Sequence, residues 1–279
     1  MTERRPTEAA HLSAHALDEM SPEEVLQLIH HEDGVAHAAV AEVLPEMAAA
    51  VEILTCSLSG GGRWFNVGAG TSGRLGVLDA SEIPPTYGLS PRIVQGVIAG
   101  GDRALRHAVE DVEDDAEAGA LEIEERGVTI GDVVVGISAS GHTPFVIGAL
   151  EAAVRLGART VAITCDPDSP LAESVEISIA PCVGPEVVAG STRMKGGLVQ
   201  KMILSALSTT VMVQMGRVRG HHMTHVSPAS GKLRGRAVRM LMEIAGIDRD
   251  DARKLLRANE GSVARSLESV EAQKKLADH

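Results

Sequence analysis

The chain has 279 residues, of which 44% are apolar and 23% are charged, a composition typical of a globular protein with enough apolar residues for one or two domain cores. Its 26 Lys and Arg residues against 38 Asp and Glu residues give a net charge of −12. This acidic balance argues against nucleic acid and anionic membranes as partners, because binding to either depends on neutralising phosphate groups. A small anionic ligand is still compatible with it, provided that backbone N–H groups and a few local cations bind the anion.

The first elements are expected to be helical. Residues 1–20 show no sustained periodicity and are expected to form an arm. The Ser-Pro-Glu-Glu stretch at residues 21–24 matches a capping box with Pro at the first helical position. It predicts a helix that ends at about residue 31, and a second, Ala-rich helix is predicted over residues 34–58.

From residue 63 onward, short β-branched runs bounded by Gly alternate with helical segments, which indicates βαβ units and a parallel sheet. The predicted strands lie near residues 63–67, 93–98, 133–137, 160–164 and 176–180. The predicted helices between and after them lie near residues 73–80, 102–119, 143–156 and 191–215. These elements predict an α/β fold with a doubly wound five-stranded parallel sheet.

The rest of the chain is predicted to be a small C-terminal helical bundle. One helix is expected over residues 230–245, and Ile247-Asp248 is expected to open another that continues in short turns to the C-terminus. The predicted organisation is therefore an N-terminal arm with helices (1–44), a sheet domain (45–215) and a helical segment (216–279).

Three loops at the ends of predicted strands carry Gly, Ser and Thr, and ligands of open α/β sheets bind at such loops. The first, at residues 68–74, satisfies GxGxxG, but the acidic residue of a dinucleotide site is poorly matched, since Asp102 lies 29 residues beyond Gly73. The second covers residues 138–143 and the third residues 190–195.

Each loop opens a helix and offers backbone N–H groups and hydroxyl donors, the chemistry that binds phosphate. In any single loop the Ser and Thr residues are as readily explained as helix N-caps. Three such loops at strand ends favour a phosphorylated polyol over a dinucleotide. The candidate substrate-binding residues are Gly70, Thr71, Ser72, Gly73, Arg74, Ser138, Ser140, Gly141, Thr143, Ser191, Thr192, Arg193 and Lys195.

Two carboxylate segments are candidates for acid–base chemistry. Glu82 precedes Pro84-Pro85, which are expected to fix the backbone in an extended or turn geometry, although a solvated Glu at a helix end explains the segment equally well. In the predicted helix over residues 102–119, Glu110 and Glu113 share one face with Glu117. Most of this acidic run is expected to be solvated, because like charges at this spacing repel.

A metal site is not expected. The histidines of the run at residues 221–225 lack an HExxH motif, paired thiolates and a carboxylate at ligand spacing. The three cysteines, Cys56, Cys165 and Cys182, form no CxxC pair, and we interpret them as buried, inert thiols in a reducing cytosol. No signal-peptide pattern and no run of about 18 apolar residues was found, which predicts a soluble, cytoplasmic protein.

With these loops in place, the chain resembles the N-acetylmuramic acid 6-phosphate etherases, a family built on the sugar isomerase (SIS) fold, over nearly its whole length. The most specific matching stretches are 67–76, 78–82, 84–86, 108–110, 113–114, 139–141, 184–188 and 190–195. The resemblance implies a substrate whose lactyl ether at C3 is removed, giving N-acetylglucosamine 6-phosphate and D-lactate. The implied steps are ring opening, loss of the C2 proton, departure of lactate and addition of water.

By the same resemblance, Glu82 matches the acid/base that assists lactate departure, and Glu113 matches the second catalytic carboxylate, a candidate C2 base. The resemblance implies no metal or nucleotide cofactor. It does imply a homodimer. A carbon acid beside an aldehyde is a far weaker acid than a carboxyl group of pKa ~4.3, so the base must be desolvated and the enolate oxygen must meet donors.

The chain departs from the family pattern at four positions. His142 stands where the family has Arg, Leu198 where it has Thr, and His225 and Ser230 where it has Asp and Asn. Two alternatives therefore stay open, a phosphosugar isomerase and a non-catalytic phosphosugar-sensing regulator on the same fold. Release of lactate separates the first from an etherase, and retention of Glu82 and Glu113 argues against the second.

Overall fold

The computed structural model describes residues 7, 9–14, 16–226 and 231–277, and for Lys232 and residues 274–277 it describes the backbone alone. The chain divides into two compact units. The first comprises residues 1–81 and 92–211, and the second comprises residues 82–91 and 212–279.

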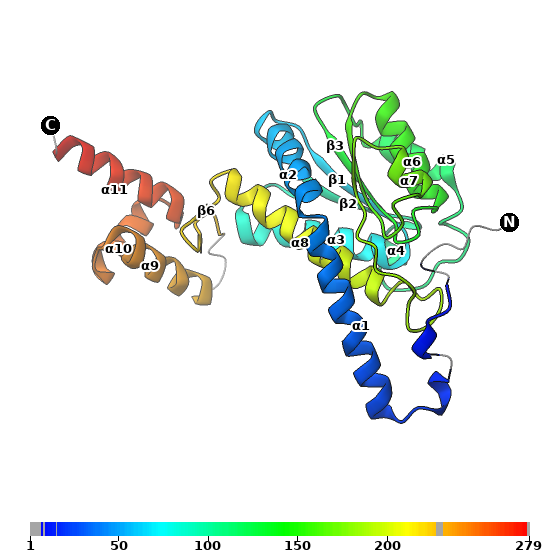
Figure 1. Cartoon of the computed structure of the whole chain (residues 1–279). Helices are drawn as coiled ribbons and strands as arrows, with labels where there is room; N and C mark the ends of the chain where they lie inside the picture. Colours follow the sequence, from blue (N-terminus) through cyan, green and yellow to red (C-terminus); the bar gives the residue numbers. More distant parts are fainter. Residues whose placement is uncertain (1–6, 8, 15, 227–230, 278–279) are drawn as a thin grey trace. The chain divides into compact units, whose positions relative to one another are not determined.

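The first unit is built on a five-stranded parallel sheet with the order β2-β1-β3-β4-β5 (Figure 1). Every predicted strand is confirmed to within one residue at each end. The observed bounds are β1 Trp64–Gly68, β2 Val94–Ile98, β3 Val133–Ile137, β4 Arg159–Ile163 and β5 Ile177–Ile179. Gly68 pairs in register with both Ile98 and Ile137, so the carboxyl ends of the three strands lie at one edge. The strand order reverses between β1 and β3, which makes this edge the topological switch point where such sheets bind ligands.

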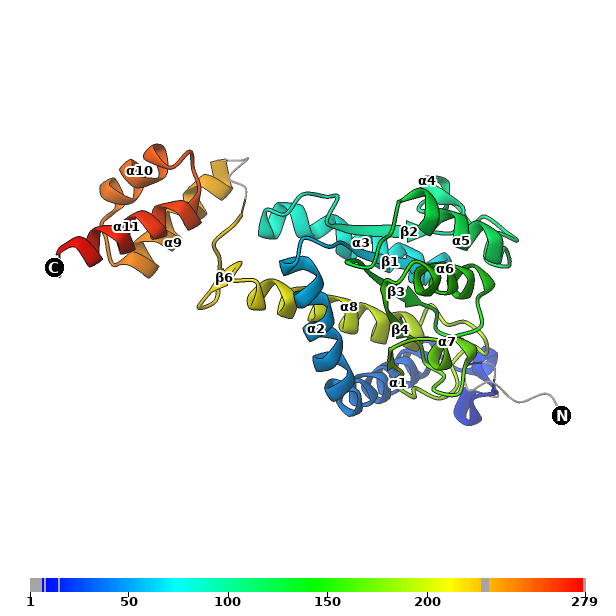
Figure 2. The same cartoon turned by 90° about the horizontal axis from the view of Figure 1, so that it is seen from above.

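Helices cover both faces of the sheet (Figure 2). On one face, α5 (Ala116–Glu125) and α6 (Pro144–Arg155) pack against buried strand residues such as Phe65 and Val134. These two helices approach closely, since a Cβ atom on Gly119 would lie 1.9 Å from the carbonyl oxygen of Phe145. The other face carries α2 (Leu44–Ser59) and α8 (Lys195–Gln214). The doubly wound α/β prediction is confirmed.

Helix boundaries at the N-terminus differ from the prediction. The capping box at Ser21 is confirmed, because its Oγ accepts the Glu24 N–H while the Glu24 carboxylate accepts the Ser21 N–H. The helix α1, however, runs over Pro22–Glu42, and the break falls at Val43 rather than near residue 32. Pro45 explains the break, because it has no N–H to continue the ladder of α1. Gly34 lies inside the helix, where an added Cβ atom would meet nothing within 4 Å.

The predicted acidic helix over residues 102–119 is wrong. The chain forms the short α4 (Gly101–Ala104) and then an irregular loop up to Asp115, whose carboxylate caps α5 by accepting the Ala118 N–H at 2.9 Å. Asp111 within the loop has a positive φ of 65°. Repulsion between closely spaced carboxylates disfavours a helix here, so Glu110, Glu113 and Glu117 do not share a helix face.

Helix α8 begins at Lys195, four residues later than predicted. Among the described residues it is the one helix long and apolar enough to cross a membrane by length and composition, and 56% of its most apolar window is buried within the protein. Val199, Ile203 and Leu207 are fully buried. The apolar stretch therefore serves as a core helix of the first unit.

The second unit has its own apolar core. A short hairpin of β6 (Val218–Arg219) and β7 (His222–Met223) precedes α9 (Gly231–Ala245), α10 (Arg249–Ala258) and α11 (Val263–Ala277). Helix α10 opens at Asp248, as predicted, and the Asp248 carboxylate caps it by accepting the N–H groups of Asp250 and Asp251. Leu241, Leu256 and Val263 are among its buried core residues.

Candidate functional site

The first predicted loop makes the tight strand-to-helix turn that its glycines indicate. It joins β1 to α3 (Gly70–Tyr87). A Cβ atom on Gly68 would lie 2.6 Å from the Gly73 nitrogen, and one on Gly73 would lie 2.6 Å from the Gly68 oxygen. Only glycine fits both positions, and Gly70 also has a positive φ of 51°. Within the loop, the Ser72 hydroxyl donates to Gln200 Oε1 of α8 at 3.0 Å.

The second loop gathers three hydroxyl groups between β3 and α6. Ser138 Oγ lies 2.8 Å from Thr143 Oγ1 and 3.4 Å from Ser140 Oγ. Thr143 occupies the N-cap position of α6, but its side chain makes no capping hydrogen bond, so the N-cap explanation does not hold for it. Gly141 has a φ of 69°, and a Cβ atom there would lie 2.1 Å from Ser169 Oγ. The loop is thus held in a shape that only glycine permits.

The third loop leads into α8, whose N-terminus lies between the other two loops. A Cβ atom on Gly196 would lie 3.0 Å from the Ala139 Cβ of the second loop, and one on Gly197 would lie 3.3 Å from Thr71 Cγ2 of the first. The same Cβ atom on Gly196 would lie 3.4 Å from Thr192 Cβ of the third loop. The structure therefore brings the three loops together at one place, the carboxyl edge of the sheet.

The N-terminus of α8 is not free to bind an anion, contrary to what the sequence suggested. The buried carboxylate of Glu186 accepts the N–H groups of Lys195 and Gly196, both at 2.9 Å. The next N–H, of Gly197, donates to the Thr192 carbonyl at 2.8 Å. A fixed protein carboxylate thus takes the place at this helix end that a phosphate would take.

Lys195 itself is buried and forms an ion pair through Nζ with Glu32 of α1. His11 Nε2 lies 3.1 Å from the other oxygen of Glu32. Burial by itself would raise the pKa of Glu32, but the hydrogen bonds from Lys195 and His11 outweigh it and hold the pKa below its ordinary value. Lys195 is thus engaged inside the protein, whereas Arg193 is exposed and Ser191 half-buried in the same loop.

Glu113 lies beside the first and second loops. Its backbone carbonyl accepts the Phe145 N–H at the start of α6 at 3.0 Å. Together with Gly70, Arg74 and Glu110 it lines a cavity of about 160 Å³. The Arg74 guanidinium donates to the His107 carbonyl at 3.2 Å and so ties the acidic loop to α3. Glu113 is exposed in the single chain.

Glu82 is exposed and belongs to the second unit, near the end of α3. The predicted extended or turn geometry at Pro84-Pro85 is wrong, because α3 continues through both prolines to Tyr87. The two prolines leave the carbonyl groups of Ala80 and Ser81 without their helical donors. The helix then ends at Gly88, whose N–H donates to the Pro84 carbonyl and whose φ is 68°.

Of the four positions that depart from the family pattern, His142 lies in the second loop, where its Nδ1 is 2.7 Å from the Ser140 carbonyl. Leu198 is half-buried in the first turn of α8. His225, in the second unit, is 3.1 Å from Thr224 Oγ1, and burial followed by the charge of Arg217 lowers its pKa. Ser230 lies outside the described residues.

Sequence reasoning missed the residues that support the loops. Glu186, Glu32, His11 and Gln200 contact loop residues but were not expected in the site. The Gly-Pro-Glu stretch at residues 184–186 was noted only as a matching motif, and its position shortly before α8 is the one signal available in the sequence. The thiol prediction was wrong for Cys56 and Cys182, which are exposed, and holds for the burial of Cys165.

The chain is similar to proteins of known family over most of its length. Residues 46–154 match the glucokinase regulatory protein N-terminal SIS domain, and residues 118–210 match the SIS domain. An N-acetylmuramic acid 6-phosphate etherase of Symbiobacterium thermophilum is 51% identical over 251 residues, which cover 90% of this chain and 83% of that protein. One of Escherichia fergusonii is 44% identical over 284 residues, which cover 99% and 95%.

Two solved structures share the fold. A protein of Escherichia coli CFT073, solved in complex with a ligand, aligns with a TM-score of 0.53 at 21% identity, over 72% of this chain and 96% of that chain. A phosphoheptose isomerase from Francisella tularensis aligns with a TM-score of 0.53 at 19% identity, over 70% and 100%. At these identities the likeness establishes the SIS fold of the first unit and no more.

Proposed function

The chain belongs to the N-acetylmuramic acid 6-phosphate etherase family, and from this premise we propose that it is a carbon–oxygen lyase acting on N-acetylmuramic acid 6-phosphate. It removes the lactyl group from C3 and gives N-acetylglucosamine 6-phosphate and D-lactate. The observation that carries the proposal is the meeting of three Ser/Thr/Gly loops at the switch point of the sheet, beside a cavity lined by Glu113. Residues 45–215 are the proposed phosphosugar-binding domain.

The phosphate is held by the hydroxyl groups of the first two loops and by the exposed Arg193. Ser138 Oγ lies within 3.4 Å of both Ser140 Oγ and Thr143 Oγ1, and Ser72 donates to the buried Gln200. The Gln200 Nε2 has no hydrogen-bond partner among the described residues, so this end of the site has an unused donor. Lys195 anchors the third loop through Glu32 rather than contacting the phosphate.

Glu113 is the proposed base that removes the C2 proton, and Glu82 is the proposed acid that protonates the departing lactate and then activates water. A positioned acid or base typically contributes ~10²–10⁴-fold to such a step. The base must also be desolvated, because water stabilises its charged form and weakens it toward a carbon acid. Glu113 and Glu82 are both exposed in the single chain.

This exposure supports a homodimer in which a second copy covers the site. Helix α1 leaves Leu26 and Val35 exposed, at 66% and 39% of their surface, and α2 exposes Leu44 at 55%. Such apolar side chains on neighbouring helices suit a protein interface. We also propose that the protein acts in the cytoplasm.

The direct test is to incubate the protein with N-acetylmuramic acid 6-phosphate and measure D-lactate. Wild type should release one lactate per substrate, and Glu82→Gln and Glu113→Gln should each lower kcat by ~10²-fold or more. Glu117→Gln is the matched control, since Glu117 is an exposed residue of α5 and its loss should leave the rate unchanged. Folded wild type that releases no lactate refutes the etherase assignment, and variants as active as wild type refute the residue roles.

A further inference from the structure

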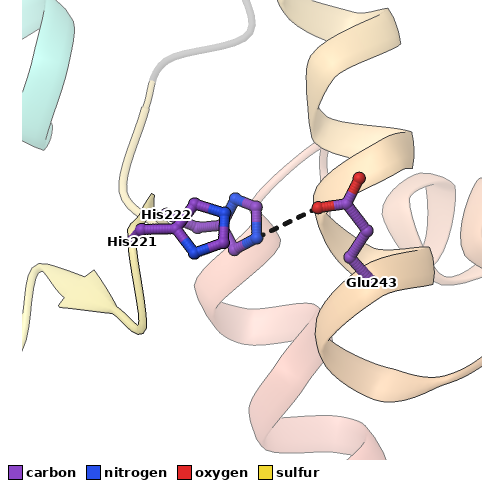
Figure 3. A group of neighbouring side chains, drawn as sticks. All are labelled: His221, His222 and Glu243. Carbon is purple, nitrogen blue, oxygen red and sulfur yellow. Dashed lines mark ion pairs between the residues drawn. The ribbon is translucent and has the colours of Figure 1, made fainter.

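Two histidines and a glutamate come together in the second unit, outside the loops described above. The ligating atoms of His221, His222 and Glu243 all lie within 4.8 Å of one another. His222 Nε2 is 3.2 Å from Glu243 Oε2, and the two imidazole rings lie with their centroids 4.0 Å apart (Figure 3). This is the one group of three metal-ligating side chains that the described part of the chain brings together.

The backbone holds the two histidines in place. They follow Gly220, whose φ of 60° turns the chain between β6 and β7. The hairpin is closed by the Thr224 N–H, which donates to the Arg217 carbonyl at 3.2 Å, and the Thr224 carbonyl accepts the Ala264 N–H of α11 at 3.1 Å. Glu243 is supplied by α9. The three ligands thus come from two elements of the second unit, the β6–β7 hairpin and α9.

We propose that His221, His222 and Glu243 bind a transition-metal ion of the zinc type, with solvent or an anion in the remaining position. Two imidazole nitrogens and one carboxylate oxygen are a ligand set that zinc accepts, and metal–ligand bonds of ~2.0–2.1 Å in a tetrahedron place ligand atoms about 3.3 Å apart. The His222–Glu243 separation of 3.2 Å already matches this spacing. Mg²⁺ and Ca²⁺ are excluded by their preference for oxygen ligands alone.

Two arginines near the proposed metal site affect how it binds cations and anions. His222, Met223 and Glu243 line a hollow of about 310 Å³ together with Arg236 and Arg239. The two guanidinium groups repel a cation and therefore weaken its binding. They also attract an anion into the open coordination position. The metal ion does so too, because two neutral imidazoles and one carboxylate leave a divalent ion with a net positive charge.

Metal binding would join the β6–β7 hairpin to α9. A ligand that binds only the folded state stabilises it by mass action, so Zn²⁺ raises the melting temperature of the second unit. This role is independent of the proposed etherase reaction, because none of the three ligands was assigned to it.

The test uses the full chain without a histidine tag. Isothermal titration with Zn²⁺ should show one ion bound per chain, and Co²⁺ should give the visible absorption of a low-symmetry site with nitrogen ligands. His221→Ala with His222→Ala, and separately Glu243→Gln, should each weaken binding at least tenfold and abolish the rise in melting temperature.

The control is His30→Ala with His31→Ala, which removes another adjacent and exposed histidine pair, on α1. It should leave Zn²⁺ binding unchanged. Absence of saturable binding by wild type, binding that survives in the His221/His222 double variant, or an equal loss in the His30/His31 variant overturns the proposal. Because none of the three ligands is fully buried, circular dichroism of the variants should match wild type, and Glu243→Gln supplies a second reading that leaves both rings in place.

Discussion

Lys195 lies 163 positions from Glu32 in the chain, yet their side chains form a buried ion pair. The sequence placed Lys195 correctly in the third loop but gave it a phosphate as partner, because a partner so distant along the chain leaves no local pattern. Glu186 was missed for a related reason. A carboxylate that caps a helix from a preceding loop can stand at any number of residues before the helix start, so no sequence spacing identifies it. The glycine and hydroxyl positions could be predicted because turn geometry demands those residue types.

The variant Glu32→Gln tests how much this ion pair stabilises the fold. Removing one partner of a buried pair leaves the other charge uncompensated and should cost about 3 kcal/mol of unfolding free energy at pH 7. Unfolding in urea can be followed by the fluorescence of Trp64, the single tryptophan, which is buried in β1. Glu176→Gln is the control, because its pair with Arg159 is nearly half exposed and should contribute less than about 1 kcal/mol.

The unfolding free energy that the Glu32 carboxylate contributes should depend on pH. The folded-state pKa of Glu32 lies below its ordinary value of 4.5, so its stabilisation is complete above that value and is lost as the pH falls through the folded pKa. The difference in unfolding free energy between wild type and Glu32→Gln should therefore narrow below pH 4.5. A difference that stays constant or widens in acid would show that the carboxylate charge is not what stabilises the fold.

Thr143→Val tests the hydroxyl cluster. A hydrogen bond to a charged group contributes ~1.5–3 kcal/mol, so losing the Thr143 hydroxyl should raise the KM for the phosphosugar about tenfold while the fold stays intact. Thr55→Val is the matched control, because the Thr55 hydroxyl is buried with no partner among the described residues. Equal KM values for the two variants would remove Thr143 from the proposed phosphate site.

The thiols give a chemical test of burial. Burial raises the pKa of Cys165 to about 12, and the thiolate is the reactive form. A disulfide reagent at about pH 8 should therefore modify Cys56 and Cys182, which are exposed, and reach Cys165 only after unfolding. Modification of Cys165 in the folded protein, at the rate of Cys56, would contradict the buried position.

At the scale of the element, the strands were predictable and the helices only partly. The strands β1, β3 and β4 are short and almost fully buried, and β3 and β4 are rich in β-branched residues, a pattern typical of a parallel sheet covered on both faces. Helix α1 continues through Gly34 because packing overrides a weak local preference. The acidic segment after α4 fails as a helix because its charges repel, an effect that apolar periodicity does not register.

The second loop can be tested as an element through its glycine. Gly141→Ala places a Cβ atom 2.1 Å from Ser169 Oγ at a φ of 69°, whereas Gly184→Ala has almost the same φ, 67°, but open space. Both variants should lose about 1–2 kcal/mol of unfolding free energy, because alanine is strained in the left-handed conformation. Gly141→Ala should lose about a further 1–3 kcal/mol to the clash, measured by Trp64 fluorescence in urea. Equal losses would show that the loop relaxes away from Ser169.

At the scale of the whole molecule, the net charge of −12 hides an uneven distribution. The second unit contains 13 Lys and Arg residues against 9 Asp and Glu, and the first contains 13 against 29. An average over the whole chain does not reveal this difference, which comes from residues 212–279. Residues 82–91 join these C-terminal residues in one unit although the two segments lie far apart in the sequence. The same division assigns Glu82 and Glu113 to different units, which spacing along the sequence could not foresee.

From the family membership and the loop geometry we infer that the reaction is an elimination across C2 and C3, followed by hydration. Running the reaction in D₂O and, separately, in H₂¹⁸O and examining both products by NMR and mass spectrometry tests this claim most directly. We expect deuterium at C2 and solvent oxygen at C3 of N-acetylglucosamine 6-phosphate, with the ether oxygen kept in D-lactate. Protium at C2, or solvent oxygen in the lactate hydroxyl, would contradict it.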